Sequence, residues 1–312
     1  MEEFSFSYNV KKEITEKINT KQKADACLLG MLLSCNSLSD KEISLLTENK
    51  QVMDFFVHNV NRVLDKEDSV SVNEIERRNG ATLYKVEVSE AEDRVFLLDY
   101  FRTDESRRIL ADELPKDKFL PNLVGGIFLA CGSVNNPEKK YHMEFVMPNL
   151  DLCNDFGLLM RDKFGITPKY AERKNAHVVY IKESENIIDV LTLMGASMCS
   201  MEIMNVKMMK DVRNKINRAV NCDNANIEKS LKAAERQICD IELIDKTIGL
   251  SSLPENLQEI AQVRYDNPDY NLKDLGAVLN PPISRSGANH RLQKIIEIAQ
   301  KIREEKGLKK EE

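Results

Sequence analysis

The stretches ADACLLGMLLSCNS (residues 24–37) and PNLVGGIFLACGS (residues 121–133) decide the fold of this chain. Each stretch is apolar and long enough to form a helix. The two match at equivalent positions: Gly30 with Gly126, Cys35 with Cys131, and Ser37 with Ser133. A pattern that occurs twice predicts a duplicated unit, and the residues after each helix should then repeat as well.

The residues after each apolar helix do repeat, as a strand, a helix, a hairpin and a closing helix. In the first copy we expect these elements at 42–47, 51–64, 69–75 with 82–88, and 91–101. In the second copy we expect them at 141–147, 150–164, 169–173 with 177–182, and 186–195. Asn79-Gly80 in the first hairpin is the strongest short signal for a tight turn. Two such units bury a shared face only by packing together, which predicts one pseudo-symmetric α+β domain with copies at 1–110 and 111–203.

The C-terminal part of the chain predicts an all-α helix-turn-helix domain at 250–305. Helices are expected at 253–264, 271–279 and 284–303. Asn271 and Ser284 are suitable N-caps, and Pro281-Pro282 prevents the second helix from continuing. The helix-turn-helix itself should span about Asn271 to Glu304. A unit of this kind places one helix in the major groove of DNA.

Side chains near the start of the last helix are of the types that bind nucleic acid. Arg, Asn and Gln can make paired hydrogen bonds to the edges of guanine and adenine. The expected DNA-binding residues are Ser284, Arg285, Ser286, Asn289, His290, Arg291 and Lys294, and Gln293 also points outward. The alternative is an ordinary three-helix bundle with a polar surface. His290 is equally consistent with a surface histidine bonded to a neighbour.

Charge is distributed unevenly along the chain. From residue 204 onward there are 19 Lys+Arg and 17 Asp+Glu, net +2, whereas the preceding residues have a net charge of −8. Within 281–303, five basic side chains are accompanied by Glu297 as the sole acid. An acidic surface repels a phosphate backbone. We therefore expect the C-terminal third to recognise double-stranded DNA.

Residues 204–249 predict a helical linker between the two parts. Basic side chains lie beside an apolar stripe in its first half and are candidate phosphate contacts, although a solvated helix face is the alternative. These side chains are Lys207, Lys210, Arg213, Lys215 and Arg218. The Asn and Asp residues of 221–226 predict a helix stop and a new N-cap, with a second helix from about 227 to 244. Residues 306–312 form a charged tail.

Composition argues against a metal, a cofactor and a membrane span. The seven cysteines are odd in number and contain no Cys-x-x-Cys pair, which speaks against both a disulfide framework and a zinc site. The four histidines are widely separated and offer little to a metal cluster. No apolar run approaches the roughly 20 residues that cross a bilayer, and Met1 to Tyr8 lacks the features of a signal peptide. We expect a cytoplasmic protein without metal or cofactor.

The two apolar helices resemble the LAGLIDADG helices of homing endonucleases. In that family the paired helices cross at a pseudo-twofold axis, where small residues let the backbones approach. The resemblance places the family's catalytic acids at Cys35 and Cys131 of this chain. Hard cations such as Mg²⁺ need oxygen ligands, so two thiols cannot replace the carboxylates that hold the metal. The resemblance therefore implies the fold without catalytic residues, and a residual endonuclease is the alternative.

A degenerate LAGLIDADG domain followed by a helix-turn-helix resembles the WhiA family of bacterial regulators over essentially the whole chain. The stretches that support this resemblance are 128–142, 213–237, 253–264 and 284–292, and the last two also resemble the promoter-reading domain of sigma factors. The family implies a non-enzymatic, nucleoid-associated DNA-binding transcription regulator. Its members act in sporulation in some bacteria, and in cell division and chromosome segregation in others.

The sequence leaves several points of function open. The acidic domain is alternatively a protein- or ligand-binding module, and nothing in its residues names a partner. The DNA target, the oligomeric state, and the choice between activation and repression are not encoded in any pattern recognised above. Neither is the choice between a division role and a sporulation role.

Overall fold

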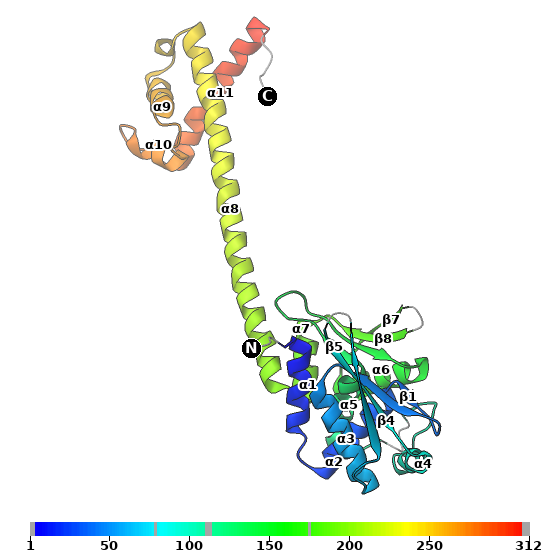
Figure 1. Cartoon of the computed structure of the whole chain (residues 1–312). Helices are drawn as coiled ribbons and strands as arrows, with labels where there is room; N and C mark the ends of the chain where they lie inside the picture. The colour runs from blue at the N-terminus through cyan, green and yellow to red at the C-terminus, as the bar shows by residue number, and fades with distance from the viewer. Residues whose placement is uncertain (1–3, 78–79, 110–113, 174–175, 308–312) are drawn as a thin grey trace. The chain divides into compact units, whose positions relative to one another are not determined.

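The computed structural model describes residues 4–77, 80–109, 114–173 and 176–307. By its contacts the chain divides into two compact units, Met1–Asp211 and Val212–Glu312 (Figure 1). Residues 78–79 and 174–175 of the predicted hairpin turns lie outside the described residues, as do the predicted boundary at 110–111 and the end of the charged tail. The domain limits drawn from the sequence therefore remain predictions.

The first copy of the repeat has the predicted order of elements. Its helices are α1 (Phe6–Lys17), α2 (Lys21–Ser34), α3 (Lys50–Leu64) and α4 (Ala91–Tyr100). Its strands are β1 (Ser37–Leu38), β2 (Ile43–Thr47), β3 (Val70–Glu76) and β4 (Thr82–Val88). They form an antiparallel sheet in the order β1-β2-β4-β3. Two elements were not predicted: α1, which precedes the repeat, and the short strand β1.

The second copy repeats this arrangement. Its helices are α5 (Leu120–Cys131), α6 (Leu150–Phe164) and α7 (Ser184–Leu193), with a 3₁₀ turn, η2 (Asp117–Phe119), before α5. Its strands are β5 (Gly132–Val134), β6 (Met143–Met147), β7 (Lys169–Arg173) and β8 (Ala176–Ile181). The sheet order β5-β6-β8-β7 matches that of the first copy strand by strand. The predicted pseudo-symmetric α+β domain is thus confirmed.

The helices α2 and α5 cross at two paired glycines. A Cβ added at Gly30 would collide with the carbonyl oxygen of Leu123, and a Cβ added at Gly126 would collide with that of Cys27. Only glycine therefore allows the two backbones to approach so closely. Buried side chains from both copies, such as Phe128, continue from this crossing into a single apolar cluster among the described residues. Cys35 and Cys131, at the ends of α2 and α5, pack in or against this cluster.

The long helix α8 (Ser197–Thr247) is unbroken over 51 residues, which corrects the predicted stop at 221–226. Asn and Asp are mediocre helix formers, but each costs only about 0.7 kcal/mol relative to alanine, and the stretch has no glycine or proline. At its start, the two carboxylate oxygens of Glu13 accept hydrogen bonds from the amides of Met198 at 2.7 Å and Cys199 at 3.1 Å. An acid from α1 thus caps α8. No helix among the described residues is both long and apolar enough to cross a membrane.

The C-terminal unit packs three shorter helices against the end of α8. They are α9 (Glu255–Asp266), α10 (Leu272–Val278) and α11 (Arg285–Lys306), after a 3₁₀ turn, η3 (Leu250–Ser252). Their core is built from Ile241, Ile244, Leu257, Ile260, Leu275, Leu292 and Ile295. Both predicted caps are confirmed: Asn271 Oδ1 accepts from the amides of Lys273 and Asp274, and Ser284 Oγ accepts from that of Gly287. The predicted three-helix order is correct.

Candidate nucleic-acid interface

The turn between α10 and α11 is held by contacts on both sides. The Ile283 amide donates to the Gly276 carbonyl at 2.8 Å, and a Cβ at Gly276 would collide with the carbonyl oxygen of Ile283. The Asn280 amide donates to Oε1 of Glu259 at 2.6 Å, which ties the turn to α9. Because the turn is fixed to both neighbours, it sets the direction in which α11 begins.

The first three turns of α11 present an exposed polar face opposite the core. Ala288, Leu292 and Ile295 are buried in the apolar cluster of the unit. At about 100° per residue, the side chains between them fall on the outer side of the helix. The exposed residues there are Arg285, Ser286, Asn289, His290, Gln293 and Lys294. The structure therefore brings together five of the seven predicted DNA-binding residues, and Gln293 lies beside them.

The other two predicted residues have structural partners. The hydroxyl of Ser284 is occupied as the N-cap of α11, where it accepts from Gly287 at 3.2 Å. Arg291 has a side chain 20 % exposed; its Nη1 donates to the Asn256 carbonyl at 3.3 Å and lies 3.6 Å from Oε2 of Glu259. These contacts attach the start of α11 to α9. Both residues thus hold the helix that presents the exposed face.

Arg264 supports the same unit, and its contacts with the following loop were not identified from the sequence. It is only 2 % exposed, and its Nη1 donates to the carbonyls of Tyr270 at 2.7 Å and Pro268 at 3.2 Å. Desolvation lowers the pKa of its guanidinium. Both carbonyls belong to the loop after α9, so the guanidinium ties this loop to the end of the helix. Its position before an Asn-Pro-Asp loop is the signal that could have identified this role.

The five candidate phosphate contacts on α8 fall into two groups. Lys207 forms an ion pair with Glu185. Lys210 donates to the Pro137 carbonyl at 2.5 Å and lies 4.8 Å from the centre of the Tyr141 ring. Both lysines are therefore engaged within the N-terminal unit. The remaining three side chains are exposed on α8: Arg213, Lys215 and Arg218.

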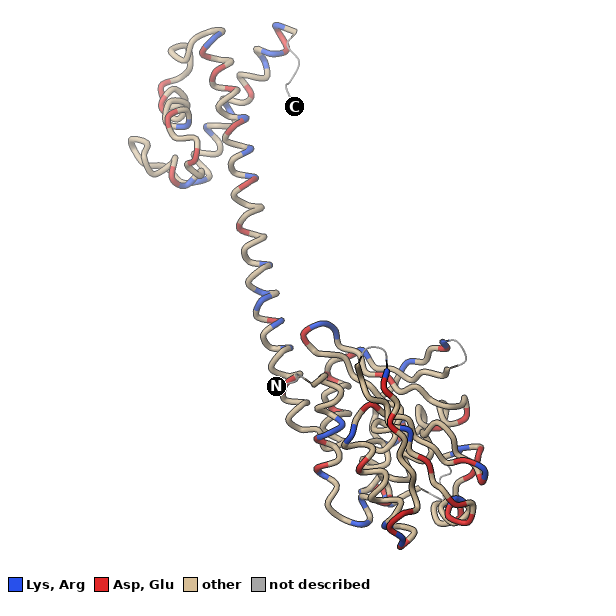
Figure 2. Tube along the Cα trace, in the orientation of Figure 1, with Lys and Arg blue, Asp and Glu red and all other residues tan. Residues whose placement is uncertain are grey.

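The outer faces of the two sheets pair their cations with acids. Lys85 precedes the buried Val86 in β4, so its side chain points to the other face of the sheet. Its Nζ lies 3.0 Å from a carboxylate oxygen of Glu87 and 3.6 Å from one of Glu42. Arg173 in the second sheet lies 3.2 Å from Glu144. Figure 2 shows acidic and basic residues interspersed over this unit. A surface whose cations are already neutralised gives a phosphate backbone little electrostatic attraction.

The two positions at which the resemblance expects catalytic acids lie where α2 and α5 end, and both hold buried or part-buried thiols. The single S–H of Cys35 can donate to the carbonyl of Leu32, 3.0 Å from Sγ, or to that of Ser37, 2.9 Å from Sγ. Burial raises the pKa of Cys35 to about 11, against the opposing effect of Arg107. Burial likewise raises the pKa of Cys131 to about 12. Both thiols therefore stay neutral at physiological pH.

Two cations occupy equivalent places beside these thiols. Arg107 Nη1 donates to the carbonyls of Leu33 at 3.0 Å and Cys35 at 2.6 Å. Lys11 Nζ donates to the carbonyl of Leu129 at 3.0 Å, and Leu129 stands to Gly126 as Leu33 stands to Gly30 in the duplicated pattern.

These cations place positive charge beside the two thiols. Burial lowers the pKa of Lys11 to about 8, with Cys131 and Glu48 opposing the shift. Each cation donates to a carbonyl at the negative end of a helix, where a divalent ion would meet like charge. Among the described residues, no group of three or more His, Cys, Asp or Glu side chains could hold a metal ion. Neither Lys11 nor Arg107 was singled out from the sequence.

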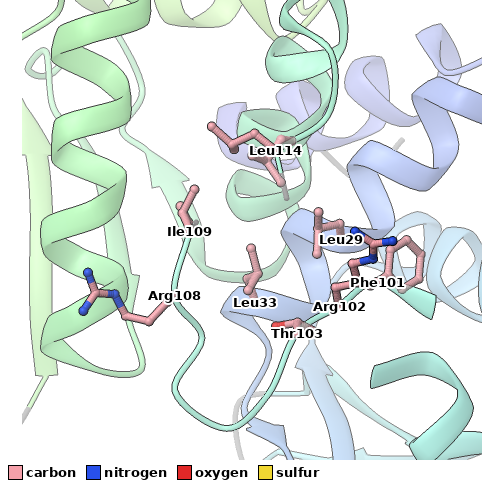
Figure 3. A pocket seen from close by; sticks show the side chains of 9 residues that line it. Leu29, Leu33, Phe101, Arg102, Thr103, Arg108, Ile109 and Leu114 are labelled. Atoms are coloured by element: carbon pink, nitrogen blue, oxygen red, sulfur yellow. The ribbon is translucent and has the colours of Figure 1, made fainter. Parts of the chain in front are cut away.

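A small cavity beside α2 is too small for an organic ligand. It has room for about 20 Å³, and Thr103, whose hydroxyl is buried without a hydrogen-bond partner, contributes to its wall (Figure 3). Arg108, on the same rim, is drawn away to Asp155 at 2.7 Å. Sites for small molecules usually enclose about 300 Å³ or more. This cavity has the volume of roughly one water.

The two units define a class of protein in which a LAGLIDADG-type α+β unit without its acids is joined to a helix-turn-helix. Family models match each part: the WhiA LAGLIDADG-like domain matches residues 120–213, and the WhiA C-terminal HTH domain matches residues 216–299. The chain belongs to the WhiA family. This membership and the fold confirm the resemblance drawn from the sequence.

Relatives extend the match over nearly the whole chain. A protein of Clostridium perfringens named "Probable cell division protein WhiA" is 38 % identical, with 96 % of this chain and 98 % of the relative covered. A protein of the same name from Clostridium acetobutylicum is 36 % identical, with 96 % and 99 % covered. The crystal structure titled "full-length DUF199/WhiA from Thermatoga maritima" has a TM-score of 0.57 at 24 % identity and covers 96 % of this chain and 99 % of that one. The last match supports the fold alone.

Proposed function

We propose that this protein is a non-enzymatic, DNA-binding transcription regulator whose α11 lies in the major groove of duplex DNA. The observation that supports it most is the exposed face of α11, where polar and basic side chains gather on a helix fixed by the turn before it. The helix-turn-helix family match and the relatives named as probable cell division proteins point the same way.

The exposed side chains of α11 divide by chemistry. Arg285 and Asn289 have the donor and acceptor patterns that recognise guanine and adenine edges. Ser286, His290 and Lys294 can bond to bases or to phosphates, and phosphate contacts fix the register of a protein on DNA without reading sequence. Ser284 and Arg291 support DNA binding indirectly, because their side chains fix the start of α11.

We assign the cellular role to cell division and chromosome segregation, with sporulation control as the alternative, and place the protein on the nucleoid. The names of the relatives favour division. Cleavage of DNA is disfavoured, because the centre of the N-terminal unit holds Lys11 and Arg107 beside neutral thiols, an arrangement that repels Mg²⁺.

Selection of bound sequences from a random duplex pool, followed by affinity measurements on the full chain, tests the proposal. Asn289→Ala and Arg285→Ala should each weaken binding to the selected site by about 1–3 kcal/mol and relax preference at one base position. Lys301→Ala, farther along the same helix, is the matched control and should retain that preference. Selection of no sequence by the wild type, or unchanged preference in both variants, would contradict the assignment of α11 as the reader.

A further inference from the structure

Five cations share one side of α8 within the C-terminal unit. They are Lys215, Arg218, Lys229, Lys232 and Arg236, and all five are exposed. At about 100° per residue they fall within an arc of about 100° on the helix surface. We call this set the α8 basic face. At about 1.5 Å per residue it is roughly 32 Å long.

The α8 basic face exists because the helix does not break at 221–226. A stop there would leave the direction of Lys229 independent of that of Arg218. In the unbroken helix the two positions between them are occupied by Cys222 and Ala225, which are exposed, small and uncharged. Because the helix is continuous, Lys229, Lys232 and Arg236 align with Lys215 and Arg218, from which the predicted stop at 221–226 would separate them.

Acids of the same stretch lie off this face. Asp223, Glu228 and Glu235 each fall at least about 80° from its centre on the helix circumference. Glu228 pairs with Lys232 at 2.6 Å, but both side chains are more than 60 % exposed, and such surface pairs contribute at most about 1 kcal/mol. A phosphate can therefore replace this carboxylate. An ordinary solvated helix face mixes both signs of charge, and this one does not.

The chemistry of the α8 basic face favours phosphates over a protein partner. Protein interfaces usually have an apolar centre, whereas the large apolar side chains of this stretch, such as Ile216 and Ile227, lie on the opposite side of the helix. The length of the face is close to one turn of B-DNA, about 34 Å. Arg236 precedes Ile241, a core residue of the helix-turn-helix unit, by five residues in the same helix.

We propose that the α8 basic face binds the sugar-phosphate backbone of duplex DNA, as a second contact that adds affinity without sequence preference. This inference rests on the proposed DNA-binding function and adds Lys229, Lys232 and Arg236 to the contacts expected from the sequence. It makes the salt dependence of binding, rather than base preference, the property that these residues control.

The test compares full-length variants on a random-sequence duplex of about three helical turns. The first variant replaces all five cations of the α8 basic face with glutamine. In the matched control, glutamine replaces five exposed lysines of the N-terminal unit: Lys21, Lys41, Lys50, Lys116 and Lys118. Each phosphate contact contributes about 0.9 to the slope of log affinity against log salt. The first variant should therefore lose up to about 4.5 from that slope and bind at least about tenfold more weakly at low salt. The control should change the slope by less than about 1.

A pair of insertions after Ala225 tests the alignment while keeping every charge. One added alanine turns Lys229, Lys232 and Arg236 by about 100° away from Lys215 and Arg218, and should lower the slope. An insertion of about two helical turns restores the alignment of the cations. It should therefore recover part of the lost salt slope. Circular dichroism would check that the helix persists.

The outcomes separate this inference from the function on which it rests. A wild type that binds no duplex would overturn both. A wild type that binds, with an unchanged slope in the five-fold variant or the single insertion, would overturn the α8 basic face alone. Unchanged DNA binding combined with loss of self-association in sedimentation would assign the face to an acidic protein surface instead, and would also overturn it.

Discussion

Replacing Arg107 with methionine should destabilise the N-terminal unit far more than the same change at Arg102. Arg107 is 6 % exposed and donates to two carbonyls at the end of α2. Methionine retains much of its length but removes both donors. Hydrogen bonds from charged groups contribute about 1.5–3 kcal/mol each, and removal of a buried charge returns part of that through relief of desolvation. We therefore expect a net loss of about 3 kcal/mol, or about 6–12 °C in Tm for a unit of this size.

Arg102→Met is a matched control because both arginines have positive φ, 49° at Arg102 and 56° at Arg107. Arg102 is exposed at the rim of the small cavity (Figure 3), so its replacement should change stability by less than about 0.5 kcal/mol. Thermal unfolding of the full chain, together with hydrogen exchange of peptides from α2, gives the global and local losses. A loss under about 1 kcal/mol at Arg107, or equal losses in the two variants, would refute the view that this guanidinium stabilises the end of α2.

Three further outcomes follow from the same unit. Glu13→Ala removes the cap of α8 and should cost about 1–2 kcal/mol, seen as faster hydrogen exchange in the first turns of α8; unchanged exchange would count against it. The pKa of Lys11 is about 8 when folded and ordinarily 10.5, so the unfolded chain binds the extra proton between these values. Wild-type stability should therefore rise relative to Lys11→Met from pH 8 to pH 10.5 in denaturant titrations, and a constant difference would exclude this lysine as the cause. Gly126→Ala should prevent folding because its Cβ would overlap a carbonyl, whereas Gly125→Ala, with its nearest atom at 3.4 Å, should be tolerated; equal solubility and melting of the two would show that the crossing can widen.

Local patterns in the sequence were enough to predict the duplicated fold and the helix-turn-helix. The spacing of Gly30 and Cys35 recurs at Gly126 and Cys131, and hydrophobic alternation after each helix defines the same strands twice. The caps at Asn271 and Ser284 depend on contacts within three residues. Residues close together in the chain determine features of this kind, so a sequence pattern is enough to predict them.

The features missed depend on distant contacts or on small energetic differences. Lys11 and Arg107 reach helix ends that lie more than seventy residues away in the chain, and no local signal pairs them with Leu129 or Leu33. Arg291 stays a predicted DNA contact, but no local signal in the sequence shows that it also lies 3.6 Å from Glu259 of another helix. The stop expected at 221–226 failed because several weak helix formers together do not equal one proline.

The helix α1 lies outside the duplication, yet it supplies a contact that the duplicated pattern needs. One of the two equivalent helix ends receives its cation from this preceding helix, and the other receives it from the segment that joins the copies. Two segments of unrelated sequence therefore supply the equivalent cations of the two copies. A fragment that begins at α2 would contain both repeats in full and still lack the charge at the end of α5 and the cap of α8. We therefore expect a fragment without α1 to be less stable than the whole unit, although it contains every element of the repeat.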